Sequence, residues 1–228
     1  MIDSFKQSIR LYTRKFEGVT LLSLTVLFPL LIINWYILNV VYAFVFNDFT
    51  SALADFYYIL LTFIFLVLAQ IPFIRFVQMY EEEGEIRYKD IYRVFIINAF
   101  SLFLFGIILS LLTSVGALFF IIPGLIVLTF FFTAPYEAIL ERKSVWKSVK
   151  TSIQFAKKKF FPLLIIILLV SFTELVIGGI STYLIYSISS SLLAQILVQM
   201  LLNIVIFPFL VIWVTYYFRD WKAANQLA

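Results

Sequence analysis

The chain has 228 residues, of which 63% are apolar and 13% charged, with a net charge of +4 and neither histidine nor cysteine. Soluble domains carry about 25% charged residues, so this composition excludes a soluble fold and indicates an integral membrane protein. A sequence without Cys or His excludes disulfides, thiol chemistry and the usual transition-metal ligands. We therefore expect no cofactor and no metal.

The basic residues are distributed very unevenly along the chain. All 17 Lys and Arg residues fall in four segments, at 1–18, 75–93, 137–159 and 219–228, and the polar breaks between the other apolar stretches contain none. Basic loops stay on the cytoplasmic face during membrane insertion. The sequence therefore predicts a single integral membrane domain over residues 1–228 that crosses the membrane six times, with both termini cytoplasmic.

Six apolar stretches are long enough to cross a membrane, since a spanning helix needs about 20 mostly apolar residues. In chain order, the predicted spans are 19–46, 56–74, 94–112, 117–136, 160–187 and 192–218. The short polar breaks at 47–55, 113–116 and 188–191 then become outer turns. The alternating pattern of a membrane barrel is missing, so we expect an all-α bundle of six transmembrane helices.

Two of the basic segments are similar to each other. SFKQSIRLYTRKF at 4–16 and SVKTSIQFAKKKF at 148–160 share six identical positions at a constant offset of 144 residues, and each leads directly into a span. Helical spacing predicts amphipathic helices over about 4–16 and 144–159, just before the first and fifth spans. Their apolar stripes are predicted at Phe5, Ile9, Tyr12 and Phe16, and at Val149, Ile153, Ala156 and Phe160.

The basic side chains of both segments are predicted to lie opposite these stripes. They are Lys6, Arg10 and Arg14 in the first segment, and Lys143, Lys147, Lys150 and Lys158 in the second. Basic amphipathic helices lie in the membrane interface and attract anionic headgroups, so membrane lipid is the partner that this pattern favours. The alternative is that the two helices only complete the topology and brace the bundle.

The loop before the third span is strongly charged. Glu81, Glu82, Glu83 and Glu85 precede Arg87, Lys89 and Arg93. We interpret this loop as solvated and self-neutralising, and a cation site is the alternative.

Polar residues at one depth suggest a site near the membrane midplane. Glu174 is the only ionisable residue near the centre of a predicted span, and an ionised carboxylate is costly in hydrocarbon. Counted from the cytoplasmic ends of their spans, Asn34 lies 15 residues in, Glu174 14 and Asn203 15. We expect these three, with Gln199 one helical turn from Asn203, to form a polar cluster. It would act as a structural clasp, or alternatively as a proton or ion relay.

The fourth predicted span contains a Pro123-Gly124 pair. Proline removes an amide donor and kinks helices, so we expect the sharpest helix break there. Discontinuous helices can build transport sites, although kinks also shape ordinary bundles.

Residues 118–164 carry a resemblance to a known family. The Pro123-Gly124 pair, an acidic residue at the span end (Glu141) and the alternating Lys-Ser helix at 144–152 resemble a family of uncharacterised six-span prokaryotic membrane proteins. That family includes the YciC-like proteins and the membrane domain attached to some glycerophosphodiester phosphodiesterases. The resemblance implies the architecture and a prokaryotic plasma-membrane location. It implies no catalytic site, because the phosphodiesterase chemistry belongs to a separate soluble domain.

The sequence leaves two functional classes open. An enzyme is disfavoured because there is no histidine base, no cysteine nucleophile and no pair of acidic residues within the spans. The favoured class is a non-catalytic accessory or envelope-organising protein that engages anionic lipid and a protein partner or a second copy of itself, with no role for nucleic acid. The alternative is a small transporter or channel around Glu174.

Overall fold

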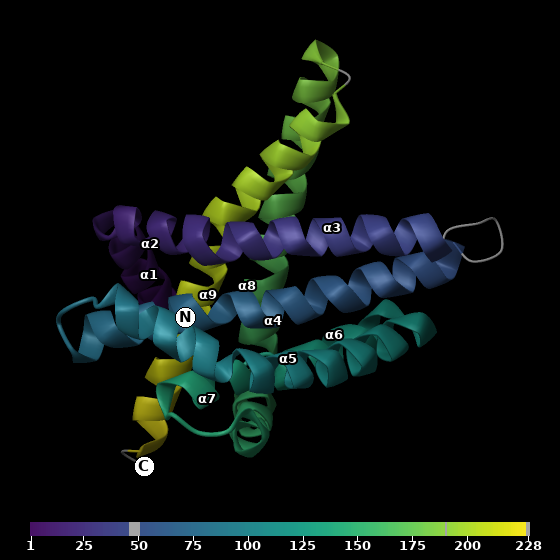
Figure 1. The fold of residues 1–228 in the computed structure, drawn as a ribbon. Coiled ribbons are helices and arrows are strands. Elements are labelled where there is room, and N and C mark those ends of the chain that lie inside the picture. Colours follow the sequence, from purple (N-terminus) through teal and green to yellow (C-terminus); the bar gives the residue numbers. More distant parts are fainter. Residues whose placement is uncertain (46–50, 190, 227–228) are drawn as a thin grey trace.

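The computed structural model describes residues 1–45, 51–189 and 191–226, and this part of the chain contains helices and short connections but no strand. The helices are α1 (Ile2–Arg14), α2 (Phe16–Leu22), a π-helical turn η1 (Ser23–Leu27), α3 (Phe28–Val45), α4 (Ser51–Glu82), α5 (Tyr88–Phe119), α6 (Ile121–Phe131), α7 (Ala134–Leu140), α8 (Val145–Ile188) and α9 (Leu192–Gln226) (Figure 1).

Six of the helical stretches are long and apolar enough to cross a membrane, which confirms the expected all-α, six-helix membrane fold. They are Phe16–Phe44, Phe56–Glu82, Tyr88–Ala117, Ile122–Leu140, Val145–Ile188 and Leu192–Asn225. Several extend past the predicted ends. The helix α4, for example, continues beyond Ile74 because Phe76, Val77 and Met79 are fully buried in the protein core.

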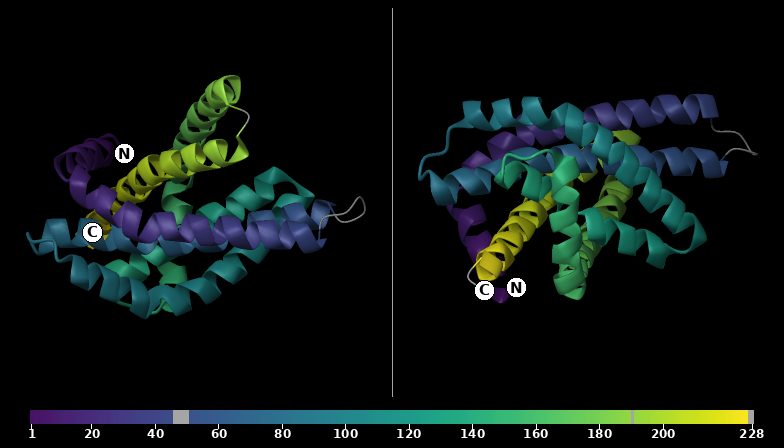
Figure 2. Two further views of the ribbon diagram at one scale, coloured as in Figure 1. Left: turned by 45° about the horizontal axis from the view of Figure 1, so that its top comes forward. Right: turned by 90° about the horizontal axis from the view of Figure 1, so that it is seen from below.

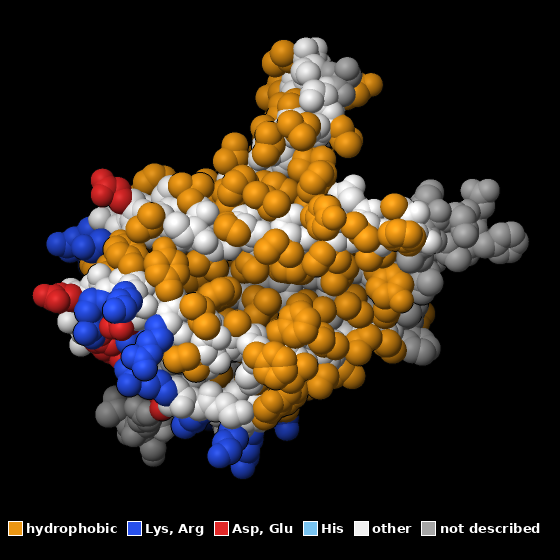
Figure 3. All heavy atoms as spheres, viewed as in Figure 1, with side chains coloured by type: hydrophobic (Ala, Val, Ile, Leu, Met, Phe, Trp, Pro, Cys, Tyr) orange, Lys and Arg blue, Asp and Glu red, His pale blue; other side chains and the backbone are white. Residues whose placement is uncertain are grey.

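The spans form two groups. Helices α3, α4 and α5 lie side by side, with α6 returning along α5, whereas α8 and α9 form a hairpin that crosses this layer (Figures 1 and 2). The part of the hairpin around its tip projects away from the other helices, and beyond Val170 the only buried residue of α8 is Gly178. At the opposite end, Phe73 and Phe76 of α4 join Tyr217 and Phe218 of α9 in the buried core. Charged side chains gather at that same end, where α4 stops and α5 starts (Figure 3).

The two similar segments share a backbone feature. The backbone leaves helical geometry at Lys15 (φ −120°, ψ 31°), and the same happens inside α8 at Lys159 (φ −131°, ψ 28°). These lysines occupy equivalent positions of the two copies. The break separates α1 from the first span and the N-terminal part of α8 from the fifth span, so each copy consists of a short helix that bends into a long apolar one.

The buried faces of the two short helices agree only in part with the predicted stripes, of which Ala156 is fully buried and Phe5, Tyr12 and Val149 pack against the core. The residues that α1 buries are Ser4, Ser8 and Leu11, and α8 buries the equivalent Ser148, Ser152 and Phe155. Ile9 and Phe16, which were predicted in the first stripe, are exposed instead. The prediction ranked side chains by hydrophobicity, but serines are small and allow close approach between helices while their hydroxyls bond locally, as Ser8 does to the Ser4 carbonyl at 2.6 Å.

The prediction of a break at Pro123-Gly124 is wrong. The chain breaks before the pair, at the extended residue Phe120, and Pro123 lies in the first turn of α6, where a missing amide costs no hydrogen bond. A second interruption separates α6 from α7 just before Pro135. Gly124 serves close packing instead, because a Cβ there would come within 2.9 Å of the Thr113 carbonyl oxygen.

Two of the predicted outer turns also need comment. Residues 113–116 were predicted as a turn but are helical, because α5 continues to Phe119 and turns at Phe120. Of the turn predicted at 47–55, residues 47–50 lie outside the described residues and the remainder belongs to α4. Residue 190 of the third turn likewise lies outside them.

Candidate functional site

A small cavity lies between η1, α3, α4 and α9 at the depth where the polar cluster was predicted. Its volume is about 60 Å³, and its polar lining residues are Asn34, Thr62 and Asn203 among leucines, phenylalanines and an alanine. Neither Asn34 Oδ1 nor Thr62 Oγ1 has a hydrogen-bond partner among the described residues. Buried polar atoms are normally paired with protein or ordered water. The cavity is large enough for a water molecule and offers polar partners to one.

Glu174 approaches this cavity from α8 without lining it. Its carboxyl group lies near the Asn203 side chain, and Asn203 donates from Nδ2 to the Gln199 carbonyl oxygen at 3.0 Å. The structure therefore brings Asn34 to Asn203 across the cavity, and Asn203 to Glu174 across the hairpin. A direct contact between Glu174 and Asn34 is not among the contacts of the described residues.

Gln199 has a separate role in the hairpin. Its side-chain amide lies on Gly178 of α8, where an added Cβ would come within 2.9 Å of Gln199 Oε1. The two helices approach each other closely at this point because the glycine has no side chain. Gln199 thus packs the α8–α9 contact and does not line the cavity.

The helix α1 has three distinct sides. Ser4, Ser8 and Leu11 are buried against the protein. Phe5 and Tyr12 pack beside them on α9, with ring centroids of Phe5 and Trp213 4.7 Å apart. The Tyr12 hydroxyl donates to the Val205 carbonyl oxygen at 2.8 Å, and burial raises the pKa of Tyr12 to about 12.

The other two sides of α1 face outward. Ile2 and Ile9 are exposed large apolar side chains that follow the buried face around α1, and Phe16 at the start of α2 is exposed as well. Lys6, Arg10 and Arg14 are exposed on the next side, and none of them has an ion-pair partner among the described residues. Around its circumference, α1 thus has one side that packs on the protein, then an exposed apolar side, then an exposed cationic side. This arrangement is typical of a helix that lies at a membrane interface.

The predicted basic residues of the second copy are also exposed, but they differ in their contacts. Lys147 and Lys150 have no ion-pair partner in the described part of the chain. Lys158 donates from Nζ to Asn225 Oδ1 at 2.7 Å, and Lys143 lies 3.5 Å from a Glu137 carboxylate oxygen. Two of these four residues therefore belong to contacts within the protein.

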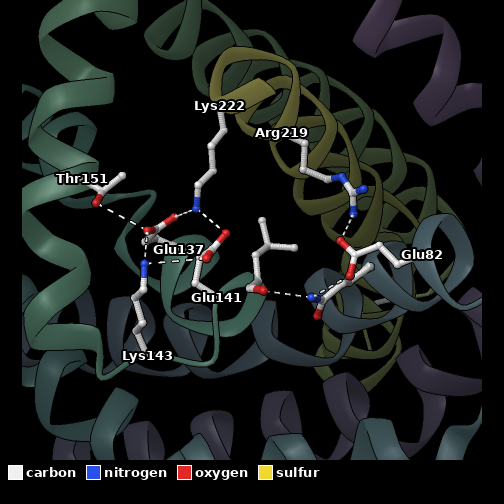
Figure 4. A network of polar contacts seen from close by, with 9 residues as sticks. Glu82, Glu137, Glu141, Lys143, Thr151, Arg219 and Lys222 are labelled. Atoms are coloured by element: carbon white, nitrogen blue, oxygen red, sulfur yellow. Dashed lines mark hydrogen bonds and ion pairs between the residues drawn. The ribbon is translucent and has the colours of Figure 1, made fainter. Parts of the chain in front are cut away.

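The sequence did not indicate a buried ion-pair network around Glu137. This α7 residue is 2% exposed, and its carboxylate accepts a hydrogen bond from Lys222 Nζ of α9 at 2.7 Å and lies 3.5 Å from Thr151 Oγ1 of α8 (Figure 4). Lys222 also bonds Glu141, and this hydrogen bond is the main cause that lowers the pKa of Glu141. The network thus joins α7, α8 and α9 at one point.

The acidic loop neutralises part of its own charge, as interpreted, because Arg87 pairs with Glu83 at 2.8 Å and with Asp90 at 3.2 Å, and it also has partners on α9. The Tyr216 hydroxyl donates to Glu81 Oε1 at 2.6 Å, and Arg219 Nη1 donates to Glu82 Oε1 at 3.1 Å. Gln78 of α4 donates to the Leu140 carbonyl oxygen of α7 at 2.9 Å. The polar end of α4 is therefore held against both α7 and α9 (Figure 4). Sequence spacing carries no signal for these contacts, since the partners are far apart along the chain.

Comparisons with protein-family models, curated proteins and solved structures find no match for this chain. The function is therefore argued from the geometry and from the sequence alone.

Proposed function

We propose that this chain is a non-catalytic, multi-pass protein of a prokaryotic plasma membrane, with both termini cytoplasmic. In this proposal it engages anionic lipid through α1, and it serves as an accessory or envelope-organising factor for a partner protein. The six apolar helices make it an integral membrane protein. The family resemblance of residues 118–164 supports the plasma-membrane location.

The observation that carries the proposal is the arrangement of sides on α1. The exposed apolar residues Ile2 and Ile9 adjoin the exposed basic residues, so the helix can place apolar groups among acyl chains and cations among headgroups at the same time. Each basic residue near an anionic leaflet contributes about 1 kcal/mol of binding free energy. Lys6, Arg10 and Arg14 are free for this role because no described residue forms an ion pair with them.

Lipid engagement can be tested on the purified chain in nanodiscs of mixed phosphatidylglycerol and phosphatidylcholine. Replacing Lys6, Arg10 and Arg14 together with Gln should reduce the number of phosphatidylglycerol molecules that co-purify, as counted by native mass spectrometry. The matched control exchanges the same residues for the other basic type (Lys6→Arg, Arg10→Lys, Arg14→Lys) and should retain the wild-type number. Equal lipid retention in all three proteins would contradict the proposal.

The proposed topology has an independent test, because the chain has no native cysteine. Single cysteines at Asp3 and at Ser189 should react with an impermeant maleimide from opposite sides of the membrane, with Asp3→Cys accessible only from the cytoplasm. Labelling of Asp3→Cys from outside intact cells would overturn the orientation.

A second function, a small transporter or channel, is favoured by the unpaired Asn34 and Thr62 oxygens around the midplane cavity. The small volume of that cavity and its separation from Glu174 support the clasp more than a pathway. In the clasp, a neutral amide can replace the carboxyl group, so Glu174→Gln should keep wild-type stability while Glu174→Leu should lose it. Proton flux in proteoliposomes that is present in wild type and abolished in Glu174→Gln would decide for transport.

A further inference from the structure

A large groove opens at the charged end of the molecule, between the end of α4, the first turns of α5, α7 and the connection to α8. Its volume is about 940 Å³. The charged residues that line it are Arg75, Glu83, Arg87, Asp90, Arg93, Arg142 and Lys143. Five of these are basic and two acidic, so the groove carries an excess of positive charge. These residues come from three separate parts of the chain, so no sequence motif indicates the groove.

Arg75 forms the inner wall of the groove and is built into the protein. It is 5% exposed, and its two terminal nitrogens donate to Gln78 Oε1 at 2.8 Å and to Glu83 Oε1 at 2.7 Å. Its third donor, Nε, has no hydrogen-bond partner among the described residues. A buried guanidinium donor without a partner is uncommon, and here it belongs to a side chain that lines a cationic groove.

Arg142 occupies a backbone conformation that favours glycine. Its φ is 53°, in the left-handed region, and it follows the C-cap of α7, where the Lys143 amide donates to the Ala138 carbonyl oxygen at 3.0 Å. Helices that end in this way usually carry glycine at that position. Strain of this kind at a non-glycine residue is found preferentially at functional sites. The arginine side chain is exposed toward the groove, and it has no ion-pair partner among the described residues.

Arg93 is the second exposed cation of the groove, and it lies where the groove meets the apolar part of α5. It is exposed and likewise has no ion-pair partner in the described part of the chain. The lining continues from Arg93 to Val94, Ile97 and Ser101, along a helix that crosses the membrane, and Ile97 is largely exposed. A ligand that holds its charge between Arg93 and Arg142 therefore has an apolar helix surface beside it for an acyl chain.

From these observations we infer that the groove is a binding site for the phosphate of an anionic phospholipid headgroup. Guanidinium groups bind phosphate oxygens through paired, charge-assisted hydrogen bonds. Arg93 and Arg142 supply complete guanidinium forks, and the buried Arg75 adds a positive charge at the inner wall. The site is separate from the exposed face of α1, so it goes beyond the proposed function and does not depend on it.

The test measures how strongly the full chain retains the lipid molecule that dissociates last. The purified protein is mixed in detergent with phosphatidylglycerol and examined by native mass spectrometry at rising activation energy. Wild type should retain one lipid molecule, and Arg93→Gln combined with Arg142→Gln should weaken its retention on the order of thirtyfold. The matched control, Lys147→Gln with Lys150→Gln, removes the same charge from an exposed face and should leave this lipid in place.

Arg142→Gly separates binding from folding. Glycine relieves the left-handed backbone, so this variant should melt at or above the wild-type temperature and still lose the retained lipid. A lower melting temperature together with unchanged lipid retention would contradict the inference.

Three outcomes would overturn the inference. One is equal loss of the lipid in the groove variant and in the Lys147/Lys150 control, which would indicate diffuse charge attraction. Another is equal retention of phosphatidylcholine, which would show that the anionic headgroup is not selected. The third is displacement of phosphatidylglycerol by inorganic phosphate, which would make the ligand a soluble anion. If the α1 variant keeps its lipids while the groove variant loses its last one, the proposed function fails and the groove site stands.

Discussion

The ion pair between Glu137 and Lys222 should be one of the strongest single polar contacts in the protein. The carboxylate and ammonium groups are 2.7 Å apart, and their side chains are 3% and 20% exposed. At that distance and an effective dielectric constant of 20, the Coulomb attraction is about 6 kcal/mol. Desolvation of both groups opposes it, and Lys143 and Glu141 remain as secondary partners. We therefore expect a net coupling of about 2 kcal/mol between Glu137 and Lys222.

A double-mutant cycle measures this coupling directly. The variants are Glu137→Gln, Lys222→Met and the combination, and unfolding by SDS in mixed micelles is followed by tryptophan fluorescence. The matched control is the cycle of Glu82 and Arg219, a more exposed pair 3.1 Å apart that also joins α9 to another helix. The control should give a coupling below about 1 kcal/mol. A Glu137–Lys222 coupling under about 0.5 kcal/mol, or one no larger than the control, would refute the assignment of this pair as the main inter-helix contact.

Three further substitutions or conditions have expected outcomes. Gly178→Leu should destabilise the fold by about 1–3 kcal/mol in the same assay, because a Cβ there meets a glutamine amide of α9 at 2.9 Å, whereas Gly179→Leu should be neutral because nothing lies within 4 Å of its Cβ. Gly18→Ala should cost about 1 kcal/mol, because its Cβ would lie 2.6 Å from the Tyr88 hydroxyl, and a combined Tyr88→Phe should recover part of that loss. The lowered pKa of Glu141 stabilises the fold above the ordinary carboxyl value of 4.5, and this stabilisation is lost as the pH falls from there toward the lowered pKa. Thermal unfolding between pH 6 and pH 3 should therefore depend less steeply on pH in Glu141→Gln than in wild type, and parallel curves would contradict the assignment.

The number of spans was predictable because it depends only on local hydrophobicity. Each apolar run is about as long as a bilayer requires or longer, and each is bounded by charged or turn residues, so no knowledge of the partner helices is needed. The end of the second amphipathic segment was predictable for the same reason, since the basic residues stop at Lys159 and the backbone bends at that residue.

The contacts of the charged residues were not predictable in the same way. Glu137 was placed at the end of a span, where a carboxylate is ordinarily solvated, and its burial depends on Lys222, which is 85 residues further along the chain. Arg75 was placed at another span end and is buried by the packing of α4. The periodicity of apolar residues predicts which side of a helix is apolar. It does not predict which other helix packs over the charged residues at the end of a span.

The two repeated segments bend at equivalent lysines, but the residues that follow the bend differ. In α8, Pro162 lies three residues after Lys159 and cannot donate an amide to the carbonyl one turn earlier. The equivalent position after Lys15 is Gly18, whose missing side chain admits the Tyr88 hydroxyl and the Phe76 ring. Since different residues produce nearly the same backbone angles, the bend is better explained by its position, between a helix that lies on the bundle and a span that enters it, than by either residue.

The sequence left open whether the two short helices attract lipid or brace the bundle, and their surroundings in the fold favour a different role for each. The α1 copy rests mainly on α9 and exposes Ile2 and Ile9 next to exposed cations, which favours contact with lipid. The α8 copy is covered by α6, α7 and α9, and its Phe155 ring lies within 5.1 Å of the rings of both Phe218 and Trp221. Phe155 is fully buried although Trp146 is exposed, and the cover by three helices favours a bracing role. Lipid attraction and bracing were alternatives for one sequence pattern, and the fold favours assigning one to each copy.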